Sequence, residues 1–241
     1  MINLYAAGSG WGVYNLSPFV LKVDCYLRMI GLPYELCSFR SLADFVQAPK
    51  GKIPYIEDNG QKVADSGFIL EYLQTTYGDR LGEQRLSPRE QAVELGLRRL
   101  IEEHLYWVIG YARYGEDAIW EEYKHLLFDR YGYTPTEFET VTAQFRDTVR
   151  TALHGQGLGR HSRVEVYTLG NADLTALSAY LGEKPYFLGE EPTALDATAY
   201  GFLANIFYVG YETPLEAHAR ALPNLRAYCD RMRQRYYSTG G

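Results

Sequence analysis

A proline stands at the start of a β-branched run that a tight turn folds back on itself. Residues 53–56, Ile-Pro-Tyr-Ile, are followed by Asn59-Gly60, the dipeptide most typical of a two-residue hairpin turn, and then by residues 61–64. Because proline has no N–H, Pro54 cannot donate to a sheet ladder, which predicts an edge strand or a special turn, often with a cis bond. The fold must therefore contain a hairpin whose entry leaves backbone groups without ladder partners.

Asp65-Ser66 follows this hairpin directly and opens a helical pattern. The exposed N–H and C=O groups of Ile53 can pair with a short extended peptide, as in strand addition. Asp65 offers a carboxylate for an ammonium group, and Ser66, with the free N–H groups of its helix, offers a place for a carboxylate. One amino-acid head group satisfies both, which predicts a site for a small peptide such as glutathione. In the plainer alternative, Asp65-Ser66 only caps a helix and Pro54 only opens a strand.

The order of predicted elements changes near residue 80. The first part reads βαβαββα, which is a thioredoxin-like order: strand 2–7, helix 17–31, strand 33–39, a short helix 42–46, the hairpin and helix 66–77. The second part shows only helical spacing, at residues 88–114, 135–154, 172–181, 194–208 and 222–236. We therefore expect an α/β plus all-α protein, with a thioredoxin-like domain at residues 1–79 and an all-helical domain at residues 88–241. Thr193 and Asp196 predict a capping box that opens the helix at 194.

Composition excludes several classes of function. The net charge is −6 and no basic block is present, which argues against nucleic acid as a partner. No apolar run reaches the ~18 residues of a membrane span. The three cysteines, Cys25, Cys37 and Cys229, have no metal-ligand spacing, so we expect reduced thiols, no metal and a cytoplasmic location.

Several segments together resemble the cytosolic glutathione S-transferase superfamily, and within it the failed-axon-connections and metaxin-like branch, including its bacterial members. The segments that carry this resemblance span nearly the whole chain: residues 17–23, 49–56, 65–66, 104–107, 157–161 and 186–189. The resemblance implies a thioredoxin-like domain followed by the helical transferase domain, with glutathione as co-substrate. It also implies a homodimer.

The resemblance places the thiol of glutathione at the N-terminus of the first helix, where Ser17 falls. A hydroxyl that donates to sulfur, with the helix dipole behind it, would favour the thiolate. Tyr14 is the competing donor, since other branches of the superfamily use a tyrosine of this loop, and Ser17 could also be only the cap before Pro18. In similar transferases a lysine at the position of Lys52 reaches the glycyl carboxylate, although an exposed strand-end lysine is equally consistent. The backbone of Phe19 would line the same site.

The resemblance places a second substrate between the domains, against an aromatic stretch of the first long C-terminal helix. We expect the pocket to include Tyr106, Trp107 and Tyr111, with Trp11 from the first loop opposite. Aromatic residues at helical spacing also form ordinary cores, so packing is the alternative interpretation.

The predicted function is a glutathione transferase-like enzyme that activates the glutathione thiol for attack on a hydrophobic electrophile, as in detoxification. The alternative is a non-catalytic interaction module, as in metaxin-like relatives. The long loop at residues 8–16 favours that alternative, because it departs from the compact loop of other transferases and could cover the pocket.

Overall fold

The computed structural model describes residues 1–39 and 48–238. Its N-terminal part is a four-stranded sheet in the order β2-β1-β3-β4. Strand β1 pairs in parallel with β2, and the remaining pairs are antiparallel. The strands and helices of this part are β1 (Ile2–Ala6), α1 (Pro18–Met29), β2 (Tyr34–Ser38), the 3₁₀ turn η1 (Pro49–Gly51), β3 (Tyr55–Asp58), β4 (Gln61–Ala64) and α3 (Ser66–Tyr77).

This arrangement is thioredoxin-like and confirms the predicted order of elements among the described residues. The helix predicted at residues 42–46 lies outside them. Of the two structures predicted for Pro54, an edge strand or a special turn with a cis bond, the second is found. The Ile53-Pro54 bond is cis, and the strand that follows, β3, is central in the sheet and not at its edge. The ladder of β3 begins at Tyr55, so Ile53 stands just outside it.

In the described residues of the C-terminal part the regular elements are helices, apart from one isolated bridge between Tyr186 and Gly189. Its helices are η2 (Glu83–Arg85), α4 (Pro88–Arg99), η3 (Leu100–Leu105), α5 (Tyr106–Tyr114), α6 (Asp117–Phe128), η4 (Asp129–Tyr131), α7 (Pro135–Gln156), η5 (Leu158–Arg160), α8 (Arg163–Leu181), α9 (Ala194–Phe207), α10 (Pro214–Arg220) and α11 (Pro223–Tyr237). The sequence patterns did not predict α6 and α10, and α8 begins nine residues before its prediction. The division into domains at residues 79 and 88 stays a prediction.

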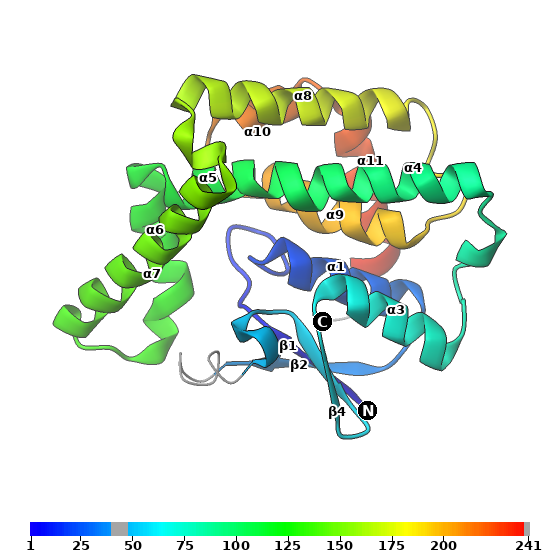
Figure 1. Ribbon diagram of the computed structural model, residues 1–241, viewed down its shortest axis with the longest axis horizontal. Coiled ribbons are helices and arrows are strands. Elements are labelled where there is room, and N and C mark those ends of the chain that lie inside the picture. Colours follow the sequence, from blue (N-terminus) through cyan, green and yellow to red (C-terminus); the bar gives the residue numbers. More distant parts are fainter. Residues whose placement is uncertain (40–47, 239–241) are drawn as a thin grey trace.

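Helices α1 and α3 lie between the sheet and the helical part (Figure 1). Helix α9 packs directly on α1, and the contact is closest at Gly201, where an added Cβ would lie 2.7 Å from the carbonyl oxygen of Pro18 and 2.8 Å from the backbone nitrogen of Lys22. Every residue of α9 from Leu195 to Phe207 is buried. The predicted capping box of Thr193 and Asp196 opens this helix. This contact joins the two parts of the chain and fixes the base of the site.

One long helix forms the wall opposite α1 and α3. It consists of α4, η3 and α5 in succession, and the six residues of η3 are π-helical. A π-helical turn accommodates one more residue than an α-helical turn, and such turns occur frequently at functional sites. Here it carries Glu102 and directly precedes Tyr106.

Candidate functional site

A cavity of about 1180 Å³ lies between the two parts of the chain and is lined by both. One wall comes from the N-terminus of α1, the segment before β3 and the N-terminus of α3. The other comes from α4, η3, α5, α6 and α7. Of the predicted glutathione-site residues, the structure brings these to the cavity wall: Ser17, Phe19, Lys52, Ile53, Pro54, Asp65 and Ser66.

Ser17 is the N-cap of α1, as the Ser-Pro pair predicts. Its hydroxyl accepts a long hydrogen bond of 3.4 Å from the backbone N–H of Val20, and its own N–H donates to Asn15 Oδ1 at 3.0 Å. A hydroxyl that accepts from the backbone keeps its hydrogen available to donate. Ser17 is therefore placed to donate a hydrogen bond to an atom in the cavity.

Tyr14 lies elsewhere. Its side chain is 41% exposed, its ring stacks on Tyr237 with centroids 4.3 Å apart, and its hydroxyl donates to the carbonyl oxygen of Tyr237 at 3.4 Å. It is not among the described residues that line the cavity. Of the two predicted thiol donors, the geometry favours Ser17.

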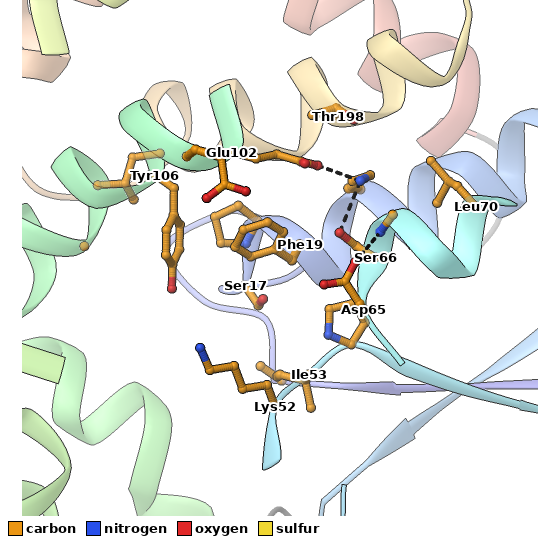
Figure 2. Close-up of a pocket in the computed structure, with 18 of the residues that line it drawn as sticks. Ser17, Phe19, Lys52, Ile53, Asp65, Ser66, Leu70, Glu102, Tyr106 and Thr198 are labelled. Carbon is orange, nitrogen blue, oxygen red and sulfur yellow. Dashed lines mark hydrogen bonds and ion pairs between the residues drawn. The ribbon is translucent and has the colours of Figure 1, made fainter. Parts of the chain in front are cut away.

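The segment before β3 presents backbone to the cavity. Because Ile53 precedes the first ladder pair of β3, its N–H and C=O are not part of the sheet. The side chain of Lys52 extends up from this segment toward the side of the cavity where Tyr106 lies (Figure 2). The free N–H and C=O groups of Ile53 are the groups that pairing with a short extended ligand requires.

Asp65 and Ser66 form the end of the cavity toward α3. Asp65 caps this helix by accepting from the N–H of Gly67 at 2.9 Å, but its backbone lies in the left-handed region, at φ 80°. That conformation is uncommon for a residue with a side chain, and strained conformations of this kind cluster at functional sites. Ser66 is 5% exposed, is the first residue of the helix and lines the cavity.

A buried ion pair beneath Ser66 was not found from the sequence. Lys22 Nζ donates to Glu102 at 2.6 Å and to Ser66 Oγ at 3.1 Å (Figure 2). Burial lowers the pKa of Lys22, and the carboxylate of Glu102 opposes that change. Both residues line the cavity. One sequence feature could have revealed this pair. Lys22 stands three residues after Phe19 and four before Tyr26, which places a lysine on the inner face of an apolar helix.

The cavity also has an aromatic lobe, next to the polar stretch that α4 and η3 contribute. Phe19 packs edge-on against Tyr106, with ring centroids 4.9 Å apart. The Tyr106 hydroxyl points from its helix into the cavity (Figure 2), and burial raises its pKa, so it stays protonated and can donate. The apolar and aromatic side chains of this lobe are Tyr106, Trp107, Tyr114, Tyr123, Leu127, Phe128, Tyr131 and Phe145.

Two of the aromatic residues predicted for this pocket lie outside its lining. Trp11 stacks on Tyr123 with centroids 5.0 Å apart, and its indole N–H donates to Glu122. Tyr111 packs edge-on against Tyr167 on the side of α5 that faces α8.

The described residues contain no group of three or more metal-ligating side chains. No helix among them is long and apolar enough to cross a membrane.

Comparisons with known proteins agree with this geometry. The glutathione S-transferase N-terminal domain matches residues 18–119, and the C-terminal domain of that family matches residues 170–232. The chain is 38% identical over 239 residues to the isoprene-epoxide–glutathione S-transferase of Rhodococcus sp. (strain AD45), a match that covers 98% of this chain and 99% of that protein. The chain belongs to the glutathione S-transferase superfamily. It is an enzyme of the glutathione transferase type.

Other relatives in the superfamily fit the predicted branch. Failed axon connections of Drosophila melanogaster is 33% identical in a match that covers 92% of this chain and 55% of that protein. This chain therefore spans about half the length of that relative. Metaxin-3 of Xenopus laevis is 28% identical over 98% of this chain and 77% of that protein.

Solved structures share the fold of the superfamily. A beta-etherase from Sphingobium sp. strain SYK-6 matches with a TM-score of 0.64 and 18% identity, over 96% of this chain and 94% of that one. A glutathione S-transferase from Methylobacterium radiotolerans JCM 2831, in complex with glutathione sulfonate, matches with a TM-score of 0.63 and 19% identity, over 97% of this chain and 91% of that one.

Proposed function

We propose that the protein binds glutathione along the wall formed by α1, the segment before β3 and α3, and adds its thiolate to a hydrophobic epoxide held in the aromatic lobe. The observation that carries this proposal is that Ser17, Ile53 and Asp65, which are far apart in sequence, line one wall of a cavity whose other wall includes an aromatic lobe. The name of the Rhodococcus relative suggests the epoxide.

In the proposed complex, each part of glutathione has a partner. The γ-glutamyl ammonium pairs with Asp65, and its carboxylate with Ser66 and the free N–H groups at the start of α3. The cysteinyl backbone pairs with Ile53, and the glycyl carboxylate with Lys52. The thiol then lies at Ser17, whose hydroxyl donates to the sulfur.

The reaction is an addition in which atoms balance without a leaving group. The thiol loses its proton to solvent, and the sulfur forms a bond to an epoxide carbon as the bond from that carbon to oxygen breaks. The oxygen takes a proton from Tyr106, which regains one from solvent. The product is a hydroxy thioether. General acid assistance of this kind typically contributes about a hundredfold or more.

Three broader features belong to the same proposal: a homodimer, a cytoplasmic location and a role in detoxification. The dimer is supported by the exposed faces of α3 and α4. Phe68 is 58% exposed, Leu95 is 45% exposed, and none of the residues of α4 is buried. Light scattering of the purified protein tests this feature separately from activity.

Calorimetric titration with glutathione tests the site. The wild-type protein should bind in the micromolar to low-millimolar range, and Asp65→Asn should weaken binding by about tenfold or more, since it removes the charge that pairs with the ammonium. Asp147→Asn, at an exposed position of α7, is the matched control and should bind like the wild type. Absence of heat with the wild-type protein, together with no protection from unfolding, would favour the interaction module over the enzyme.

A further inference from the structure

A buried arginine lies beneath the loop that leads to Ser17. Arg113, in α5, is 2% exposed. Its Nη1 donates to the carbonyl oxygen of Leu16 at 2.6 Å, and its Nη2 donates to Asn205 Oδ1 at 2.7 Å. Its Nε donates to the Tyr211 hydroxyl at 3.3 Å. A residue of the helical part thus holds the backbone carbonyl that directly precedes Ser17.

The positive charge of Arg113 has no carboxylate partner among the described residues. Its hydrogen-bond acceptors are neutral, and its other neighbours are the rings of Trp11 and Tyr123, with centroids 5.7 and 5.3 Å from the guanidinium carbon. Arginine stays protonated in proteins. A buried charge without a counter-ion costs stability, so its presence beside the site calls for a compensating role.

The same residues hold the loop in place. Asn205, in α9, donates to the carbonyl oxygen of Asn15 at 3.2 Å. Asn15 in turn donates to the carbonyl oxygen of Ala7 at 2.6 Å and accepts from the N–H of Ser17 at 3.0 Å. The chain on both sides of the loop is therefore tied to Arg113 through buried polar groups, and the position of the Ser17 hydroxyl depends on them.

Other charges at the cavity do not replace that of Arg113. Lys22 is neutralised by Glu102, with which it forms a salt bridge at 2.6 Å. Asp65 is exposed and carries the opposite sign. Arg98 and Arg99 pair with Glu94 and Glu103, and Lys50 and Lys52 are exposed, so solvent screens them. Among the described residues that line the cavity, Arg113 is the buried cation that has no carboxylate partner and is attached to the backbone next to Ser17.

We propose that Arg113 is a positioning residue that acts through Leu16 to fix Ser17, and that its unpaired charge stabilises the thiolate form of sulfur at that position. This inference rests on the proposed function. A positive charge close to a thiol favours its ionised form, and we expect an effect of about one pKa unit, which is about tenfold in the ratio of thiolate to thiol. The proton goes to solvent.

A thiol introduced at the site measures this effect without glutathione. In a Cys37→Ser background, Ser17→Cys places a thiol at the N-cap, while Cys25 and Cys229 are buried. The pH dependence of its alkylation rate by iodoacetamide, followed by mass spectrometry of the labelled peptide, gives its pKa. Adding Arg113→Gln should raise that pKa by about one unit. Adding Arg146→Gln should leave it unchanged, because Arg146, which also donates to backbone carbonyls, has the carboxylate of Asp117 as its partner.

A second variant neutralises the charge while the guanidinium stays in place. Asn205→Asp places a carboxylate beside the guanidinium, at the cost of the amide's hydrogen bonds to the carbonyl oxygens of Asn15 and Gly201, and should raise the pKa of the introduced thiol in the same direction. In the protein that keeps Ser17, the ultraviolet absorbance of bound glutathione thiolate should appear at a higher pH in both variants. An unchanged pKa of the introduced thiol in both variants would overturn the inference even if glutathione binds. A shifted pKa in a protein that does not bind glutathione would support the role of Arg113 and overturn the proposed function instead.

Discussion

Lys22 on α1 and Glu102 on η3 form a salt bridge of 2.6 Å in which the two side chains are 0% and 6% exposed. The pair spans the boundary between the thioredoxin-like and helical parts of the chain. Because Lys22 also donates to Ser66, the pair connects this boundary to the end of the cavity where we propose that the γ-glutamyl group binds.

Breaking this pair should be costly because the remaining charge stays buried. We expect Lys22→Met and Glu102→Gln each to lower the free energy of unfolding by about 3 kcal/mol. The double variant should lose less than the sum, since it leaves no unpaired charge. Chemical denaturation of the four proteins measures the coupling. Additive losses would show that the two charges act independently.

Ser17→Ala should lower the turnover of glutathione conjugation by about tenfold or more, equivalent to about 1.4 kcal/mol of barrier, with little change in folding. Tyr14→Phe should leave turnover unchanged, because Tyr14 stacks on Tyr237 outside the cavity. Steady-state kinetics at saturating glutathione compares the two. A larger loss from Tyr14→Phe would move the thiol donor to Tyr14.

Tyr106→Phe should affect substrates according to their chemistry. An epoxide oxygen needs a proton as the ring opens, so turnover of a hydrophobic epoxide should fall by about a hundredfold. Turnover of an aryl chloride, whose chloride leaves without a proton, should change little. Equal losses on both substrates would indicate that Tyr106 only shapes the pocket.

Asp196 should make the stability depend on pH. Burial raises its pKa from 3.8 to about 6, against the hydrogen bonds from Thr193 and Phe187, which lower it. Between those values the folded protein keeps a proton that the unfolded chain releases. The contribution of Asp196 to the free energy of unfolding therefore falls as the pH rises from 3.8 to about 6.

The measurement is the free energy of unfolding of the wild type minus that of Asp196→Asn at several pH values. The difference should decrease with rising pH, in total by on the order of 3 kcal/mol. Other titrating groups cancel in this subtraction. A difference that does not vary across the window would mean that Asp196 titrates near its ordinary value.

The N-terminal part was predictable because its signals are local. Proline before a β-branched run, Asn59-Gly60 and the capping residues Ser17 and Asp65 each determine the backbone within a few residues of themselves. The start of α8 was missed because its first turns contain Val164, Val166 and Gly170, which have low helix propensity. Tertiary packing outweighs that propensity: Gly170 lets Val108 and Leu215 approach so closely that an added Cβ would lie 2.7 and 2.9 Å from them.

The site was only partly predictable for a related reason. Ser17, Lys52 and Asp65 stand in recognisable local patterns, and all three line the cavity. Lys22 and Arg113 have no such pattern, because their partners, such as Glu102 and Asn205, are at least eighty residues away along the chain. Only the packing of the helical part on α1 brings them together.

The π-helical turn between α4 and α5 has a consequence for how such enzymes diverge. The turn takes up one extra residue while α5 keeps its rotational phase relative to α4. Deleting one residue from η3 should therefore restore a plain α-helix and leave Tyr106 and Trp107 facing the cavity. Deleting one residue from the α-helical turns of α5 would instead rotate every later side chain by about 100°. A change of one residue in length is thus silent in η3 but exchanges the side chains of the substrate lobe when it falls in α5, while the glutathione half of the enzyme is inherited unchanged.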